Sequence, residues 1–166
     1  MQETRQQLEL LANYNVDYVV VGGVAAALHG SSIPTYDLDV CYSRKPDNLE
    51  RLARALTSVH ATLRGAPPGL PFTPDSETLR RGLNFTLDTD IGPLDLLGEV
   101  LGVGGFDEAR QDAVMCELFG HLHAVLAIDK LIAAKKAAGR AKDLNMLPEL
   151  EAIRESAKGI PPDSAS

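Results

Sequence analysis

Aromatic residues are scarce in this chain, and tryptophan is absent: four Tyr and four Phe make up 5% of 166 residues. Any core must therefore be built from aliphatic side chains, and a hydrophobic content of 45% is sufficient for one domain of this length. Cysteine is scarce as well. Cys41 and Cys116 lie far apart and form no Cys-x-x-Cys pair, so we interpret both as small core residues without metal or redox chemistry.

The sequence also lacks long hydrophobic runs. No apolar segment approaches the roughly 20 residues that a membrane-spanning helix needs. Residues 1–5 carry neither the basic nor the apolar region of a secretory signal, so we expect a cytoplasmic protein without membrane contact. The net charge of −7 argues against a protein that grips long nucleic acid over its whole surface. One basic cluster, within residues 130–142, departs from this balance.

Helical and strand-like segments alternate along the chain. Apolar residues at helical spacing predict helices at residues 3–13, 24–29, 128–138 and 144–156, and one more that begins at Lys45 and Pro46. Apolar runs predict strands at 16–21, 36–42, 61–64, 113–119 and 121–125, and two within 84–98 around a turn at 90–93. Prolines and glycines predict a surface loop at 65–75 and a flexible connector at 102–105. This order favours an α/β (α+β) core with a small helical addition.

Two glycines close the first valine-rich strand. Gly22 and Gly23 follow Val21, and a helix of small residues comes next. Backbone N–H groups at a helix N-terminus lack partners and favour anions, so both glycines offer bare backbone to a phosphate group. A Gly-Gly pair at a strand end is also a common tight turn, and that alternative stays open.

Two aspartates share one face of the next predicted strand. Side chains alternate along a strand, so Asp37 and Asp39 project to the same side while Leu38 and Val40 point into the protein. Like charges so placed repel unless a cation neutralises them, and Mg²⁺ favours carboxylate oxygens together with substrate phosphates. The pair therefore indicates a metal site, with a solvated polar face as the alternative.

A third carboxylate is expected from a neighbouring strand. Asp95 lies inside an apolar run, where an unpaired charge is costly and needs a reason. Asp88 and Asp90 stand near the predicted turn and are explained as turn or surface residues, although Asp88 remains the second choice. Asp95 is accordingly our candidate.

Together these segments resemble the active site of the nucleotidyltransferase superfamily, the DNA polymerase β type. Thirteen residues separate Gly23 from Asp37, and Asp95 lies in the pattern Gly-x-x-Asp-Leu-Leu. The resemblance implies a nucleotidyltransferase fold, with a mixed central sheet flanked by helices. It also implies that Asp37, Asp39 and Asp95 hold two Mg²⁺ (or Mn²⁺) ions about 3.5–4 Å apart. The activity implied is transfer of a nucleoside monophosphate from an NTP to an acceptor hydroxyl.

The C-terminal third resembles the AbiEii-class nucleotidyltransferase toxins of type IV toxin-antitoxin systems. The likeness rests on Lys135 and on the segment from Arg140 to Leu144. It implies that Lys135 and Arg140 bind nucleotide phosphates, that the acceptor is an RNA end such as tRNA or a protein hydroxyl, and that an antitoxin protein is a partner. A solvated helix face explains the same charges without any function, above all for Lys136 and Lys142.

Ile33 departs from the family pattern. Relatives carry an arginine two residues before the position of Thr35, so a cation that would meet substrate phosphate is absent there. Ser31 and Ser32 can donate hydrogen bonds to phosphate but supply no charge. The candidates to replace the cation are Arg44, Arg64, Arg80 and Arg81. The alternative is a chain that kept the fold, lost catalysis, and binds nucleotide or a protein partner.

We therefore expect a nucleotidyltransferase core at residues 1–126, a helical pair packed on it at 127–158 and a flexible tail at 159–166. More distant relatives modify aminoglycoside antibiotics, so an aminoglycoside acceptor is a further alternative.

Overall fold

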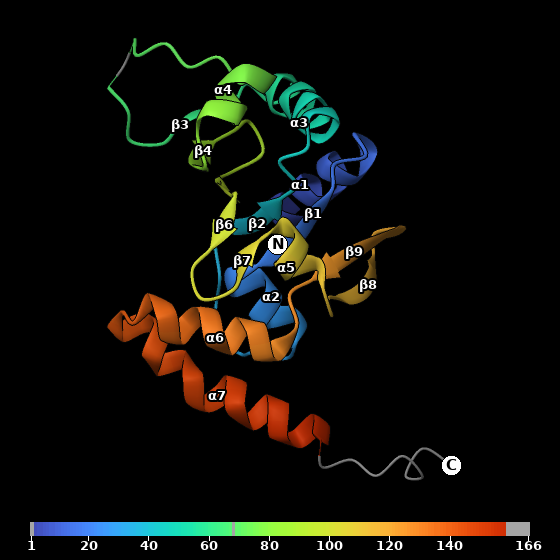
Figure 1. Ribbon diagram of the computed structural model, residues 1–166, viewed down its shortest axis with the longest axis vertical. Coiled ribbons are helices and arrows are strands. Elements are labelled where there is room, and N and C mark those ends of the chain that lie inside the picture. The colour runs from blue at the N-terminus through green and yellow to red at the C-terminus, as the bar shows by residue number, and fades with distance from the viewer. Residues whose placement is uncertain (1, 68, 159–166) are drawn as a thin grey trace.

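A computed structural model describes residues 2–67 and 69–158 of the chain (Figure 1). The tail expected at residues 159–166 lies outside the described residues. No described helix is both long enough and apolar enough to cross a membrane.

The centre of the molecule is a seven-stranded sheet with the strand order β3-β4-β5-β2-β1-β9-β8. The strands are β1 (Tyr18–Val21), β2 (Leu38–Tyr42), β3 (Thr62–Leu63), β4 (Asn84–Asp88), β5 (Leu94–Leu97), β8 (Val114–Leu118) and β9 (His121–Val125). β2 runs parallel to β5 and β1 runs parallel to β9, whereas the other neighbours are antiparallel. The sheet is therefore mixed, as predicted.

Helices flank this sheet at both ends of the molecule (Figure 1). They are α1 (Gln2–Asn13), α2 (Gly22–Leu28), α3 (Pro46–Ser58), α4 (Ser76–Arg81), α5 (Phe106–Arg110), α6 (Ile128–Ala138) and α7 (Ala141–Lys158). α6 and α7 pack on each other, and α6 also contacts α2. Figure 1 shows α3 and α4 at the far end from this pair. The mixed sheet, its flanking helices and the C-terminal helical pair confirm the predicted fold class.

Local sequence explains where the main elements begin and end. The valines of β1 are buried on both faces because the strand lies inside the sheet. Pro46 occupies the first turn of α3, where its missing N–H costs nothing. Gly139 ends α6 in the left-handed conformation, with φ of 66°, which a residue without Cβ adopts freely. β1 and β2 are neighbours in the middle of the sheet, and α6 follows β9, the other neighbour of β1.

Three details differ from the sequence-based expectation. α7 begins at Ala141 rather than at 144, and it continues through Pro148. α4 was not expected. The glycine segment at 102–105, expected as a flexible connector, belongs to a hairpin of β6 (Glu99–Val100) and β7 (Gly104–Gly105) that leads directly into α5. A Cβ on Gly102 would stand 2.7 Å from the Cβ of Ala137, so this glycine is needed for close packing of the hairpin on α6.

Candidate functional site

Strand register brings two of the predicted aspartates side by side. Asp39 of β2 is paired with Asp95 of β5, and its partner on the other side is Val21 of β1. Asp37 stands one residue before β2, and Leu38 and Val40 are fully buried on the opposite side. The sheet thus places Asp39 and Asp95 in one row, with Asp37 at its margin.

The carboxylates influence one another electrostatically. Burial, followed by the negative charge of Asp95 and a hydrogen bond with it, raises the pKa of Asp39 from 3.8 to about 7. The charge of Asp37 acts in the same direction, and the ammonium group of Lys135 opposes it. Asp39 is therefore a carboxyl group whose ionised form needs a nearby cation.

Asp95 has one oxygen without a hydrogen-bond donor. Oδ1 of Asp95 is buried and accepts no hydrogen bond within the described residues. Its nearest cation is Arg64, whose Nη2 lies 3.0 Å away. The same nitrogen, which carries two hydrogens, donates to the Leu87 carbonyl oxygen at 2.6 Å. The contact of Arg64 with Asp95 is thus a close ion pair.

The two glycines of α2 are in close contact with the residues of the site. A Cβ on Gly22 would lie 2.2 Å from Oδ2 of Asp39, and a Cβ on Gly23 would lie 2.4 Å from Oγ1 of Thr35. Gly22 also has a φ of 64°, which side-chain-bearing residues rarely adopt. The pair is needed because the aspartate strand and the segment before it approach this backbone closely.

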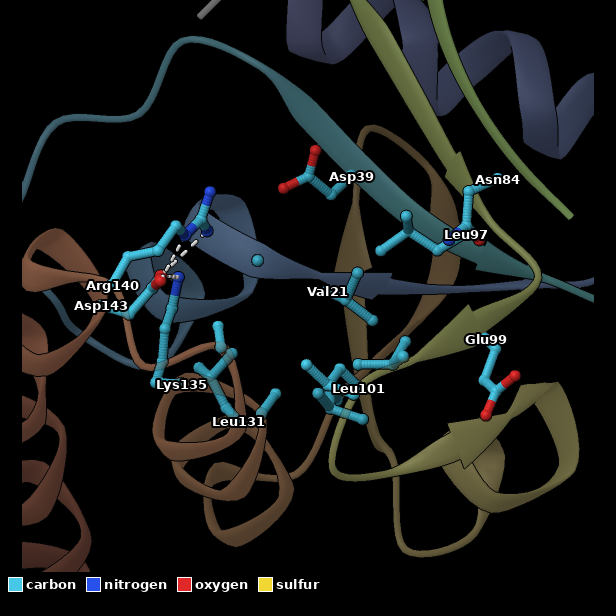
Figure 2. A pocket seen from close by; sticks show the side chains of 15 residues that line it. Val21, Asp39, Asn84, Leu97, Glu99, Leu101, Leu131, Lys135, Arg140 and Asp143 are labelled. Atoms are coloured by element: carbon cyan, nitrogen blue, oxygen red, sulfur yellow. Dashed lines mark hydrogen bonds and ion pairs between the residues drawn. The ribbon is translucent and has the colours of Figure 1, made fainter.

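A cationic group from the C-terminal helices faces the aspartates. Asp143 is 1% exposed and accepts hydrogen bonds from Arg140 Nε at 2.6 Å and from Lys135 Nζ at 3.4 Å. These contacts, the one from Arg140 above all, lower the pKa of Asp143. Figure 2 shows the three side chains together beside the strand that carries Asp39. Asp143 therefore positions two cations at the site.

Asp39 borders two cavities that share a wall, Asp37 borders one of them, and Asp95 lines neither. Four residues line both cavities: Asp39, Lys135, Arg140 and Asp143. The first cavity, of about 260 Å³, is mostly apolar, with Val21, Leu97, Leu101 and Leu131 in its lining (Figure 2). The second, of about 450 Å³, is more polar and includes Gly23, Ile33, Tyr36, Asp37 and Lys142. A polar and an apolar compartment thus meet at Asp39.

Ser31 and Ser32 do not border either cavity. Both hydroxyl groups donate to the carboxylate of Glu149 on α7, and the Ser32 hydroxyl does so at 2.6 Å. The backbone N–H of Ser32 donates to the same carboxylate at 3.2 Å. In this arrangement the serines fasten α7 to the segment between α2 and β2 rather than facing a phosphate. Nothing in the local sequence pointed to Glu149, which is more than one hundred residues away.

Ile33, where the sequence departs from the resembled pattern, lies in the polar cavity. Ile33 is 37% exposed and lines this cavity beside Asp37. Of the four arginines named as replacements, Arg44 donates to backbone carbonyls and to Tyr42, and Arg80 and Arg81 pair with Glu77. Among the described contacts, Arg64 alone of the four reaches an aspartate of the site.

The donor set suits a divalent cation in its chemistry, although it is not a closed cage. No three His, Cys, Asp or Glu side chains of the described residues already surround one point closely enough to hold a metal ion. Asp39 and Asp95 nevertheless face each other, and Oδ1 of Asp95 lacks a hydrogen-bond donor. Mg²⁺ is commonly held by one or two carboxylates with substrate phosphates completing its shell. The residues fit a metal of that kind.

Comparisons with known proteins identify the fold. No protein-family model matches the chain, and no curated protein matches its sequence. A solved structure from Thermotoga maritima, described as "a putative nucleotidyltransferase (TM1012)", matches with a TM-score of 0.51. The match covers 95% of this chain and 91% of that one at 15% sequence identity. At this identity the similarity shows the fold alone: the chain has a nucleotidyltransferase-like fold.

Proposed function

We propose that this protein is a metal-dependent nucleotidyltransferase that moves a nucleoside monophosphate from an NTP to an acceptor hydroxyl. The observation that carries the proposal is the junction of the two cavities, where Asp39 stands opposite Lys135 and Arg140. Anionic metal ligands and phosphate-binding cations are the two features that phosphoryl chemistry requires. The nucleotidyltransferase-like fold supports the same conclusion.

Each charged group has a role in this proposal. Asp37, Asp39 and Asp95 would hold Mg²⁺ or Mn²⁺, which when bound neutralises charge on the phosphates and polarises the transferred group. Lys135 and Arg140 bind the triphosphate and stabilise the charge that develops on pyrophosphate. The N–H groups of Gly22 and Gly23 remain candidates for phosphate contact. Gly23 lines the polar cavity and Gly22 the apolar one.

The reaction is a substitution at the α-phosphorus atom. The acceptor oxygen forms a new bond to that phosphorus, the bond to the oxygen bridging to the β-phosphate breaks, and pyrophosphate leaves with the electron pair. Asp95 is the carboxylate assigned to receive the hydroxyl proton. Most of the rate enhancement comes from positioning and electrostatics, since the protein itself forms no covalent bond.

The acceptor and the cellular role follow from the motif resemblance. The AbiEii-class likeness of Lys135 and of residues 140–144 favours a toxin that modifies an RNA end or a protein hydroxyl, together with a partner antitoxin. An enzyme of this kind meets its NTP substrate in the cytoplasm, which is where we place it. A polycationic aminoglycoside is the less favoured acceptor, because Lys135, Arg140 and Lys142 line the polar cavity.

A second candidate is a non-catalytic protein of the same fold that binds nucleotide or a protein partner. Ile33 favours it, because an exposed aliphatic side chain stands in the polar cavity where a cation is expected. The three aspartates favour catalysis, because a carboxylate cluster is costly to keep without a function.

The test is transfer of label from each of four α-labelled NTPs, with Mg²⁺ or Mn²⁺, to total tRNA, to a protein extract and to aminoglycosides. The Asp37→Asn, Asp39→Asn double variant removes two metal ligands, and Asp112→Asn makes the same change at an exposed position. We expect label on one acceptor with the wild type and with Asp112→Asn, but not with the double variant. Nucleotide binding without transfer would support the non-catalytic candidate.

A further inference from the structure

Arg64 continues the row of aspartates across the sheet. It follows β3 directly, and its backbone N–H donates to the Thr86 carbonyl oxygen at 2.9 Å. Thr86 is in turn the register partner of Asp95, which is the partner of Asp39. Four neighbouring strands or strand extensions therefore place Asp39, Asp95, Thr86 and Arg64 at one level. The register of the sheet therefore places Arg64 in line with the two aspartates of the candidate site.

The guanidinium group of Arg64 is held in place by three groups. Nε donates to Oδ1 of Asp88 at 3.1 Å, and Nη2 donates to the Leu87 carbonyl oxygen at 2.6 Å. Nη2 also lies 3.0 Å from Oδ1 of Asp95. The side chains of Arg64 and Asp95 are 28% and 25% exposed, so solvent only partly screens this pair. Asp88 and Leu87 thus fix a positive charge beside Asp95.

A fixed charge at this place acts on any metal ion that Asp95 binds. Oδ1 of Asp95 is buried, and the guanidinium group 3.0 Å away neutralises part of its charge. A divalent cation on the same oxygen would stand within a few ångströms of Arg64 and be repelled by it. Asp39 has no such contact with Arg64 among the described residues, and the charge of Lys135 acts on it instead.

We propose that Arg64 is a positioning residue that holds Asp95 and competes with a divalent cation for it, so that the aspartates hold one ion firmly rather than two. This inference rests on the proposed metal-dependent function and replaces one of its two expected ions with the guanidinium group. Arg64 is given no nucleotide-phosphate role, because its guanidinium group already contacts Asp88, the Leu87 carbonyl oxygen and Asp95. The phosphate-binding cations, Lys135 and Arg140, come from the other side of the site.

The experiment is a Mn²⁺ titration of the full chain, followed by the electron paramagnetic resonance signal of free Mn²⁺. We expect Arg64→Ala to bind one ion more than the wild type, or to bind the same ion at least about tenfold more tightly. Arg64→Lys keeps the positive charge and should behave like the wild type. Arg54→Ala removes the same charge from an exposed site on α3 and serves as the control.

The outcomes separate this inference from the proposed function. Equal ion number and affinity in the wild type and in Arg64→Ala would overturn the role of Arg64, even where Asp39→Asn abolishes binding and so supports the metal site. Binding that is absent from every variant would overturn both proposals. Thermal unfolding of each variant checks folding, and Arg64→Gln replaces Arg64→Ala if the alanine variant does not fold.

Discussion

The backbone of Gly22 lies directly against the carboxylate of Asp39, and a Cβ atom on Gly22 would stand 2.2 Å from Asp39 Oδ2. The glycine pair was predicted as a phosphate site, which stays a prediction, and the structure adds a second reason for glycine: the Asp39 side chain passes close to this backbone. The φ of 64° at Gly22 adds a further requirement for glycine.

Gly22→Ala should therefore damage both stability and the site. We expect a loss of about 2–4 kcal/mol in the free energy of unfolding, from backbone strain and from displacement of Asp39. Gly65→Ala is the matched control, because Gly65 also has a positive φ, of 76°, and nothing lies within 4 Å of its Cβ position. Urea denaturation of both variants measures each loss of stability. The loss in Gly65→Ala reports backbone strain alone, and the additional loss in Gly22→Ala reports the clash with Asp39. Equal losses in the two would show that the contact with Asp39 does not matter.

The raised pKa of Asp39 predicts a pH dependence of stability in the absence of metal. In the folded protein the pKa is about 7, against an ordinary value of 3.8. Between these values the folded state binds a proton that the unfolded state releases, so the free energy of unfolding falls as pH rises from about 4 to about 7 and then levels off. We expect a fall of about 4 kcal/mol at most in the wild type.

Asp39→Asn removes this titration and should flatten that part of the profile. Urea denaturation at several pH values, with a chelator present, measures it. Addition of Mg²⁺ above pH 7 should restore stability to the wild type and not to the variant, because the ion binds the deprotonated carboxylate. Parallel profiles in the two proteins would argue against burial of Asp39 as the cause.

Asp143→Asn should weaken the positioning of the two cations. The carboxylate is buried and accepts charged hydrogen bonds from Arg140 and Lys135, so we expect a loss of about 1–3 kcal/mol in stability at pH 7. The contacts lower the pKa of Asp143 in the folded protein. This contribution to stability is therefore fully present at a pH above the ordinary aspartate pKa of 3.8, and it is lost as the pH falls below that value. Asp112→Asn, at an exposed position, should leave stability unchanged. A variant as stable as the wild type at pH 7 contradicts the assignment.

Ile33→Arg should strengthen nucleotide binding. The side chain lines the polar cavity beside Asp37, so a guanidinium there meets the triphosphate. We expect KM for the NTP to fall about two- to fivefold, a range typical of one partly exposed ion pair. Leu122→Arg adds the same charge at a position that is 66% exposed and lines neither of these cavities, and it should not alter KM. An unchanged KM in Ile33→Arg would mean that the triphosphate of the NTP does not reach the side of the polar cavity that Ile33 lines.

The spacing of apolar residues in the sequence predicted most of the longer helices and strands. Alternation located β2 to within two residues, and the turn expected at 90–93 does join β4 to β5 in an antiparallel pair. Short elements were the weak point. α4, α5 and the β6-β7 hairpin have two to six residues each, too few for an apolar repeat to be recognised, and tertiary contacts such as that of Gly102 with α6 decide them.

The sequence could propose those candidate site residues whose positions depend on spacing or on burial of a charge. The i, i+2 spacing gave Asp37 and Asp39, and the cost of burying a charge identified Asp95 as a candidate. Contacts between distant segments could not be predicted. No local pattern connects Ser31 with Glu149, and none shows that Arg64, rather than Arg44, Arg80 or Arg81, contacts an aspartate of the site. Sheet register decides the second case, because Arg64 stands in line with the aspartates only through Thr86 and Asp95.

The order in which a ribosome makes the chain gives the C-terminal helices a further meaning. All three aspartates and Arg64 are present once residue 95 has been added, whereas Lys135 and Arg140 follow only after β9. A growing chain that has just passed Leu126 contains Asp37, Asp39 and Asp95 together with Arg64. It does not yet contain Lys135 or Arg140. Lys135 and Arg140 are thus the last part of the candidate site that synthesis adds, and a chain that ends before α6 lacks both of these positive charges.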